Sequence, residues 1–190
     1  FLQGDAPEGP AETVFLGVFR KADLEAVGGF CPEFDRAQDW ELNYRLRQSG
    51  REVWFSPNLR VTYRPRSTVK ALAKQFFRTG QWRREVMRRH RDSVSLRYVA
   101  APIAVTGITA GTILGLIGVV HAAKGTSLKR WPLIGWAAPL GYASRLGAGS
   151  AATKPDEDPG VRARLPLVLA IMHMSWGAGF LVGLGDRAND

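Results

Sequence analysis

Short mixed segments of apolar and polar residues fill the first half of the chain, whereas long apolar runs fill the second half. β-Branched and aromatic residues in Thr13–Phe19 are typical of a buried strand. Glycines at 28–29 and at 50 follow two segments with helical periodicity, as glycines often end helices. The expected elements are a strand, two helices and two strands: Thr13–Phe19, Lys21–Val27, 39–49, Val53–Phe55 and Val61–Tyr63. This set is too small to close a nucleotide-binding sheet, so we expect the back half of an α/β domain.

A basic amphipathic helix is expected from Ser67 to about Arg91. Apolar residues recur at helical spacing, as at Val69, Leu72 and Phe76, and lysines and arginines supply the polar side. Such a helix tends to lie among lipid headgroups, where each Lys or Arg contributes about 1 kcal/mol on anionic lipid. Two other interpretations stay open, namely a solvated face packed on the domain and binding to nucleic-acid phosphates.

Two long uncharged runs follow this helix. Val99–Val120 has 22 residues and Leu165–Gly185 has 21, and each is long enough for a hydrocarbon core of about 30 Å. Between them, Trp131–Ser144 has 14 uncharged residues and two prolines, which predicts a kinked span extended past Arg145 or a re-entrant segment. We expect about three transmembrane helices, near 99–121, 131–150 and 165–185. Because the preceding segment is basic, the positive-inside tendency places the first half of the chain in the cytoplasm.

The patterns divide the chain into three parts, an α/β half-domain over 1–66, an interfacial helix over 67–97 and a membrane region over 98–185. The net charge of +9 is concentrated near the middle part, because 11 Lys and Arg but 2 Asp and Glu lie between Arg64 and Arg97. The chain starts at Phe1 without a signal-peptide pattern, so we expect a piece of a longer polypeptide. The single cysteine, Cys31, suits a reducing compartment.

Small residues recur in the apolar runs, with glycines every four residues at Gly107, Gly111 and Gly115 and again at Gly179 and Gly183. This spacing predicts close helix packing within the chain, with homodimerisation through the glycine-lined spans as the second interpretation. His173 is the ionisable residue deep in a predicted span. Two interpretations stay open: His173 makes a functional contact with lipid, or it is a neutral histidine that is hydrogen-bonded to a neighbouring helix.

Two acids, Asp39 and Glu41, stand at the start of the second expected helix. Asp39 is a candidate general base, because a carboxylate near a hydroxyl can take its proton, a contribution of about 10²–10⁴-fold. On spacing alone, an aspartate at this place is more often an N-cap worth about 0.5–2 kcal/mol. Glu41 is expected on the exposed first turn. Arg45 and Arg47 are expected to pair with phosphate or with nearby acids.

A family resemblance rests on the run Gln-Asp-Trp-Glu-Leu-Asn-Tyr-Arg-Leu-Arg at 38–47, with Val27–Phe30 before it and Gly50 after it. With its surroundings from Phe15 to Arg84, this run resembles the acceptor half of membrane-bound family 2 glycosyltransferases, and most of all the subgroup that builds succinoglycan-type polysaccharides. The resemblance implies a GT-A-type fold and an inverting transfer with Asp39 as the base. The chain departs from the family at position 38, where Gln38 replaces an acid.

Further roles are implied by the same resemblance. Gln75-Phe76-Phe77-Arg78 resembles the Gln-x-x-Arg-Trp signature of processive membrane synthases, although Thr79 stands in place of the tryptophan. A second register, Gln81-Trp82-Arg83-Arg84, has Glu85 at that place. On the first register, the residues expected to bind acceptor or diphosphate are Gly17, Gln38, Gln75, Arg78 and Arg84.

Metal binding is also only implied. The family holds its donor and Mg²⁺ or Mn²⁺ through an upstream Asp-x-Asp motif, which the resemblance places in a missing N-terminal half. Asp156-Glu157-Asp158 has matching letters, but it lies in a loop beside proline, where a solvated linker is the simpler interpretation. No Cys/His spacing suggests zinc. We therefore expect no metal ligands in this chain and no activity from the chain alone.

The sequence thus predicts part of a glycosyltransferase of the inner or plasma membrane, with its catalytic part in the cytoplasm. Its implied partners are a nucleotide-sugar donor, a lipid-linked or polysaccharide acceptor, and membrane lipids. One alternative is a non-catalytic anchor or assembly subunit of a polysaccharide-synthesis complex, which Gln38 favours. Another is a basic nucleic-acid-binding module, which the long apolar runs argue against; no nucleic-acid partner is expected.

Overall fold

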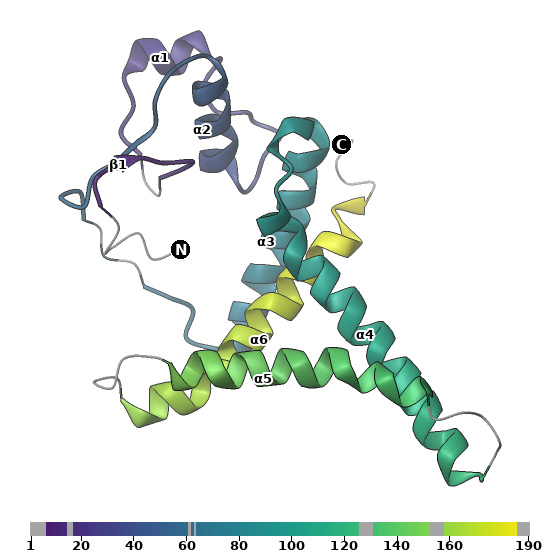
Figure 1. The fold of residues 1–190 in the computed structure, drawn as a ribbon. Helices are drawn as coiled ribbons and strands as arrows, with labels where there is room; N and C mark the ends of the chain where they lie inside the picture. The colour runs from purple at the N-terminus through teal and green to yellow at the C-terminus, as the bar shows by residue number, and fades with distance from the viewer. Residues whose placement is uncertain are drawn as a thin grey trace. The chain divides into compact units, whose positions relative to one another are not determined.

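The computed structural model describes residues 7–14, 17–60, 62, 64–125, 131–152 and 158–185. The chain forms two compact units. The first unit comprises Phe1–Arg66, Trp82–Val94 and Gly183–Asp190, and the second comprises Ser67–Gln81 and Ser95–Val182. Helix α3 (Val69–Arg89) therefore contributes its first part to the second unit and its last part to the first. Figure 1 shows the elements along the chain.

The first unit holds short helices and one small strand pair. Its elements are β1 (Gly9–Pro10), α1 (Lys21–Ala26), α2 (Gln38–Gln48), β2 (Trp54–Phe55), the end of α3 and the 3-10 turn η1 (Arg91–Ser93). Strands β1 and β2 pair antiparallel, with Gly9 opposite Phe55 and Pro10 opposite Trp54. The helix expected over Lys21–Val27 is confirmed as α1.

The prediction of an α/β half-domain is wrong. The described part of the chain is mostly helical, and its strands are two residues each. The described residues of the expected strand Thr13–Phe19 have no strand partner, and Phe15 and Leu16 lie outside the described residues. β-Propensity describes how well side chains fit a sheet that other strands supply, so apolar residues alone do not make a strand. Thr62 is not in a strand either, and its two neighbours lie outside the described residues.

Helix α2 supplies most of the core of the first unit. Leu42 and Leu46, four residues apart on one face of the helix, are both buried, Leu42 fully and Leu46 nearly so. The helix ends at Gln48, and Gly50 follows with φ of 80°, a left-handed conformation that costs glycine little. The buried apolar residues of the unit are Phe34, Trp40, Leu42, Tyr44, Leu46, Val53 and Val86. This core holds α2 against the end of α3.

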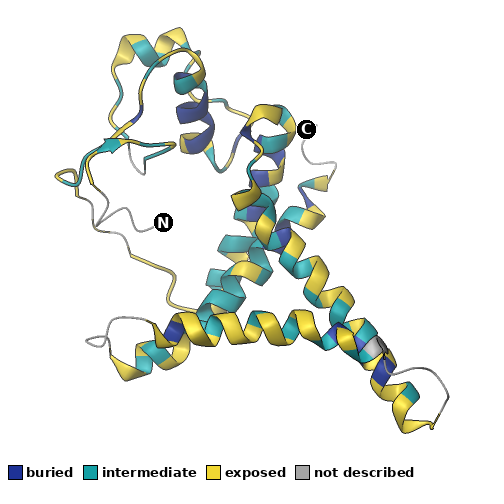
Figure 2. Cartoon of the chain, viewed as in Figure 1, coloured by how far each residue is buried: buried dark blue, intermediate teal, exposed yellow. Residues whose placement is uncertain are grey.

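The second unit contains two helices that are long and apolar enough to cross a membrane, α4 (Leu96–Ala123) and α6 (Pro159–Val182). Their most apolar stretches have mean hydropathies of 2.1 and 1.7, yet only 11% of each stretch is buried. Figure 2 shows much of the surface of α4 and α6 exposed or half-buried. Apolar side chains left uncovered along helices of this length suit a lipid environment.

A third span is not confirmed. The middle segment divides into the 3-10 helix η2 (Trp131–Trp136) and α5 (Ala137–Ala151). At 15 residues, α5 is about 22 Å long, shorter than a hydrocarbon core of about 30 Å. The three-part domain division stays a prediction.

Glycines let the helices of the second unit approach closely. A Cβ on Gly115 would lie 2.7 Å from Trp136 Nε1, and one on Gly111 would lie 3.1 Å from Ala138 Cβ. Each distance is shorter than an ordinary contact, so these positions have no room for a larger residue. The predicted packing role of these two glycines within the chain is confirmed. Gly107 faces open space, and homodimerisation stays a prediction.

The end of α6 packs against both α3 and α4. A Cβ on Gly80 would overlap the carbonyl oxygen of Trp176, and one on Gly179 would overlap the carbonyl oxygen of Phe77. A Cβ on Gly177 would lie 2.6 Å from the carbonyl oxygen of Ala101. The last turns of α6 therefore lie beside the first turns of α4.

Candidate functional site

Asp39 lies exposed on the first turn of α2. The helix begins at Gln38, after Ala37 takes a left-handed conformation with φ of 60°. Asp39 is therefore inside the helix and not at its N-cap, and its Oδ1 accepts a 2.8 Å hydrogen bond from the backbone N–H of Trp40. Gln38 is exposed beside it. The helix dipole stabilises a negative charge at this end of α2. Because Asp39 is exposed, a substrate can reach its carboxylate.

Glu41, one turn along, has a different environment from the one expected. The sequence placed it on an exposed turn, but its residue is 3% exposed. Arg45 donates to both of its oxygens, from Nε at 2.7 Å and from Nη2 at 2.8 Å. His90 Nε2 lies 3.1 Å from Glu41 Oε1. A buried carboxylate needs such partners, since its desolvation would otherwise destabilise the fold.

Arg45 also holds the turn that follows α1. Its Nη1 donates to the carbonyl oxygen of Val27, and its Nη2 donates to that of Gly29 at 2.7 Å. One guanidinium thus joins a backbone turn to a buried acid on α2. The expectation that Arg45 pairs with a nearby acid is confirmed.

Aromatic contacts surround this charged group. Trp40 stacks on Tyr44 with ring centroids 5.5 Å apart, and Tyr44 lies 4.7 Å from the His90 ring. The Arg83 guanidinium lies over the Trp40 ring, 4.2 Å from its centroid. These contacts fix α2 to the end of α3 through apolar area and cation–π attraction.

A second charged cluster lies near the end of α3. Buried Glu85 accepts hydrogen bonds from Arg88 and Arg89, and Arg89 also pairs with Glu33 at 2.5 Å. The bonds from Arg88 and then Arg89 outweigh burial and lower the pKa of Glu85 to about 2. The same bonds to Glu85 raise the pKa of both arginines. Arg89 lies over the Phe34 ring, 4.8 Å from its centroid, and so braces the segment before α2.

The remaining predicted site residues are divided between the two units. Arg84 is exposed and Gly17 is half-buried in the first unit, where a Cβ on Gly17 would lie 2.7 Å from Phe19 Cζ. Gln75 is half-buried and Arg78 is exposed on the part of α3 in the second unit. The structure thus brings Asp39, Gln38, Gly17 and Arg84 into one unit. Assembly of all six residues around one substrate stays a prediction.

Within the described residues, no three side chains of His, Cys, Asp or Glu gather closely enough to hold a metal ion. Asp156 and Glu157 lie outside the described residues. The implied Mg²⁺ or Mn²⁺ site upstream of this chain therefore stays a prediction.

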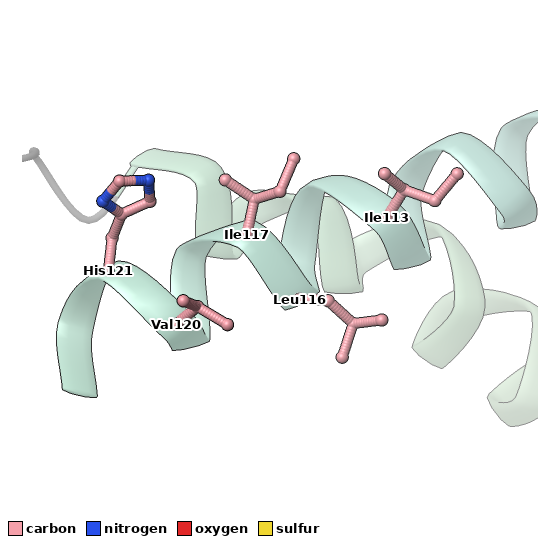
Figure 3. Close-up of a pocket in the computed structure, with 5 residues that line it drawn as sticks. All are labelled: Ile113, Leu116, Ile117, Val120 and His121. Atoms are coloured by element: carbon pink, nitrogen blue, oxygen red, sulfur yellow. The ribbon is translucent and has the colours of Figure 1, made fainter. Parts of the chain in front are cut away.

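A shallow apolar pocket lies on one face of α4. Its lining residues are Ile113, Leu116, Ile117, Val120 and His121, all from that helix (Figure 3). Four aliphatic side chains and one imidazole offer little to orient a polar substrate, whereas they suit contact with acyl chains. We therefore place the candidate chemistry at α2.

Sequence reasoning missed the network of Glu41, Arg45 and His90. The spacing of four between Glu41 and Arg45 is a signal for an ion pair within a helix. Nothing local predicts that this pair is buried or that it meets His90, which is 49 residues away in the sequence.

Comparison with known proteins finds a curated relative. The chain is 30% identical over 172 residues to the succinoglycan biosynthesis protein ExoA of Rhizobium meliloti (strain 1021). The match covers 90% of this chain and 47% of the relative, so the chain spans about half the length of the curated relative it matches. No protein-family model matches, and no solved structure does. The chain is thus a homologue of a succinoglycan biosynthesis protein, which confirms the predicted resemblance to the succinoglycan-type subgroup. Membership of glycosyltransferase family 2 stays a prediction, and a GT-A-type fold is not confirmed.

Proposed function

We propose that the chain is the acceptor-side part of an inverting glycosyltransferase. It would transfer a sugar from a nucleotide-sugar donor to a lipid-linked or polysaccharide acceptor at a membrane. The observation that carries this proposal is the exposed Asp39 carboxylate at the start of a well-packed helix, in a chain homologous along 90% of its length to a succinoglycan biosynthesis protein.

Asp39 would act as the general base. The acceptor hydroxyl attacks the anomeric carbon as the bond to the nucleoside diphosphate breaks, and the hydroxyl proton passes to Asp39. Attack opposite the leaving group inverts the anomeric centre, so one base is enough. Burial of Trp40 and Leu42 directly behind Asp39 holds its backbone in place, which supports a fixed position for the base.

Three of the other five predicted residues would serve the leaving group. Gln75, Arg78 and Arg84 offer hydrogen-bond donors and positive charge, which suit a departing diphosphate. Mg²⁺ or Mn²⁺ held by an upstream half would neutralise the same charge. Arg78 and Arg84 are both exposed and so accessible to an anion.

The membrane arrangement follows from the packing of the second unit. We propose that α4 crosses the membrane and α6 crosses back, because Gly177 near the end of α6 packs on Ala101 near the start of α4. Both ends then lie on one side, and α5 connects the helices without a full crossing. Excess Lys and Arg ahead of α4 favours the cytoplasm for that side.

A non-catalytic anchor or assembly subunit is the second candidate. The observation in its favour is Gln38, a neutral residue where the family has an acid. A subunit of this kind would keep the apolar helices and lose sugar transfer.

Sugar transfer by membranes that contain the full-length protein separates the two candidates. Labelled nucleotide sugars would be supplied singly with Mg²⁺ or Mn²⁺, and label counted in lipid-extractable and polymeric product. We expect incorporation from at least one donor above membranes without the protein. No incorporation from any donor, by protein shown to be folded in the membrane, would favour the subunit.

A further inference from the structure

We propose that Arg45 is a positioning residue for the acceptor. It would act by holding the Val27–Gly29 turn against the helix that carries Asp39. This inference rests on the proposed glycosyl transfer and adds to it the residue that shapes the acceptor side of the site.

Hydrogen bonds hold the turn to both α1 and α2. Gly28 and Gly29 have φ of 78° and 69°, two successive left-handed residues that a side chain would strain. Their N–H groups donate back to Glu25 and Leu24 of α1, at 3.0 Å and 2.9 Å. On the opposite side of the turn, Arg45 binds the carbonyl oxygens of Val27 and Gly29.

The turn and Asp39 are joined by a short loop, residues 30–37. Arg45 fixes Gly29 at its start, the buried side chain of Phe34 holds its middle, and α2 begins at its end. Phe30 is 48% exposed, and Asp35 is exposed too. Arg89 holds the same loop through Glu33 and Phe34. An acceptor that brings a hydroxyl to Asp39 therefore lies beside a loop that Arg45 holds at its first residues.

Arg45 is itself held rigidly. Glu41 accepts two of its hydrogen bonds and is nearly fully buried, and His90 lies against the same carboxylate. A planar guanidinium reaches the carboxylate and two carbonyl oxygens at once, which an ammonium on a flexible stem cannot reproduce. Arg45→Lys should therefore keep the charge and lose the position of the turn.

The kinetic test compares Arg45→Lys with wild type in membranes that contain the full-length protein. With donor saturating, we expect the acceptor KM to rise about tenfold, as loss of charged hydrogen bonds predicts, while the donor KM stays unchanged. Arg51→Gln is the matched control, because Arg51 pairs with Asp23 at 2.6 Å in the same unit and does not touch the turn. Wild-type constants for Arg45→Lys, or a lower kcat with both KM values unchanged, would overturn the proposal.

A second readout needs no activity and uses Cys31, two residues beyond the turn. Its alkylation rate is followed by mass spectrometry of the peptide in the folded full-length protein. We expect alkylation about tenfold faster in Arg45→Lys and unchanged in Arg51→Gln. Suppose that wild type transfers no sugar but Arg45→Lys is alkylated faster at Cys31. This result would contradict the proposed function and still support the inference that Arg45 holds the turn. An unchanged rate in Arg45→Lys would overturn the inference about Arg45.

If Arg45→Lys does not fold, two variants at His90 test the same inference. His90→Leu removes the contact to Glu41, whereas His90→Gln keeps an N–H donor for the same oxygen. We expect faster Cys31 alkylation in His90→Leu and the wild-type rate in His90→Gln. Wild-type rates in both variants would overturn the proposal.

Discussion

Glu85 accepts a 2.6 Å hydrogen bond from Arg89 Nε while lying 5% exposed near the end of α3. Arg88 binds the same carboxylate through two nitrogens, at 2.7 Å and 2.8 Å. This arrangement keeps Glu85 charged inside the fold, and the pKa near 2 expresses that preference.

Acid should weaken the first unit through Glu85. Its pKa is lowered from 4.5 to about 2 on folding, so its stabilisation is complete above pH 4.5 and is lost as pH falls toward 2. Glu85→Gln should lower the free energy of unfolding at pH 7 by on the order of 2 kcal/mol, the range for hydrogen bonds to a charged group, and reduce its fall below pH 4.5. Thermal unfolding in detergent from pH 7 to pH 3 measures both effects.

Glu25→Gln is the matched control for this prediction. Glu25 pairs with Lys21 at 3.6 Å on the surface, with 65% of its side chain exposed. Exposed pairs of this kind contribute about 0–1 kcal/mol. An acid profile of Glu85→Gln that matches wild type would contradict the assigned role.

Packing at the end of α6 should not tolerate a methyl group. Gly179→Ala places a Cβ against the Phe77 carbonyl, so the helices must separate. We expect destabilisation of about 1–3 kcal/mol, the usual cost of overpacking. Gly107→Ala adds the same methyl group in open space on α4 and should be neutral or stabilising, since alanine favours helices. Equal melting temperatures for the two variants in one detergent would refute the close approach.

Tyr142 and His173 should be energetically coupled. The Tyr142 hydroxyl lies 3.1 Å from His173 Nδ1, which links α5 to α6. The double-mutant cycle of Tyr142→Phe and His173→Ala should give a coupling energy of about 0.6–1.7 kcal/mol, the range for polar pairs between membrane helices. Additive effects on unfolding in detergent would mean that the pair contributes nothing. This contact favours the interhelical interpretation of His173 over the lipid-contact one.

Both ends of the helical pair should be on one side of the membrane. In a Cys31→Ser background, Val94→Cys and Gly185→Cys should react with a membrane-impermeant maleimide from the same face, and Lys124→Cys from the opposite face. Intact and inverted vesicles distinguish the faces. Reaction of Val94→Cys and Gly185→Cys from opposite faces would contradict the two crossings proposed here. It would favour an odd number of transmembrane helices, such as the three expected from the sequence.

The helices were predictable where the signal is local. The uncharged runs placed α4 and α6 because length and hydropathy are read directly from the chain. The glycine pair at 28–29 likewise predicted the end of α1, since its left-handed backbone is a local property.

The strand expected over Val53–Phe55 forms as β2 (Trp54–Phe55). The strand expected over Thr13–Phe19 was predicted wrongly, because a sheet needs partners from elsewhere in the chain. Thr13–Phe19 has suitable side chains, but its described residues pair with no strand. The local sequence pattern also gave the wrong burial for Glu41, because it predicts a surface residue. The contact with His90, which comes from a distant part of the sequence, is not visible in that pattern. Asp39 was located correctly at the start of a helix, although Ala37 and not Asp39 is the N-cap.

The central claim is that Asp39 is the base of a glycosyl transfer, and one measurement tests it most directly. Sugar transfer is compared in membranes that contain full-length wild type, Asp39→Asn or Asp92→Asn, at equal amounts of folded protein. Asp92 is an exposed acid in η1 of the same unit and controls for the loss of a surface charge. We predict that Asp39→Asn loses about 10²-fold or more of the rate, as removal of a general base implies, and that Asp92→Asn retains wild-type transfer. Wild-type transfer by Asp39→Asn would contradict the account.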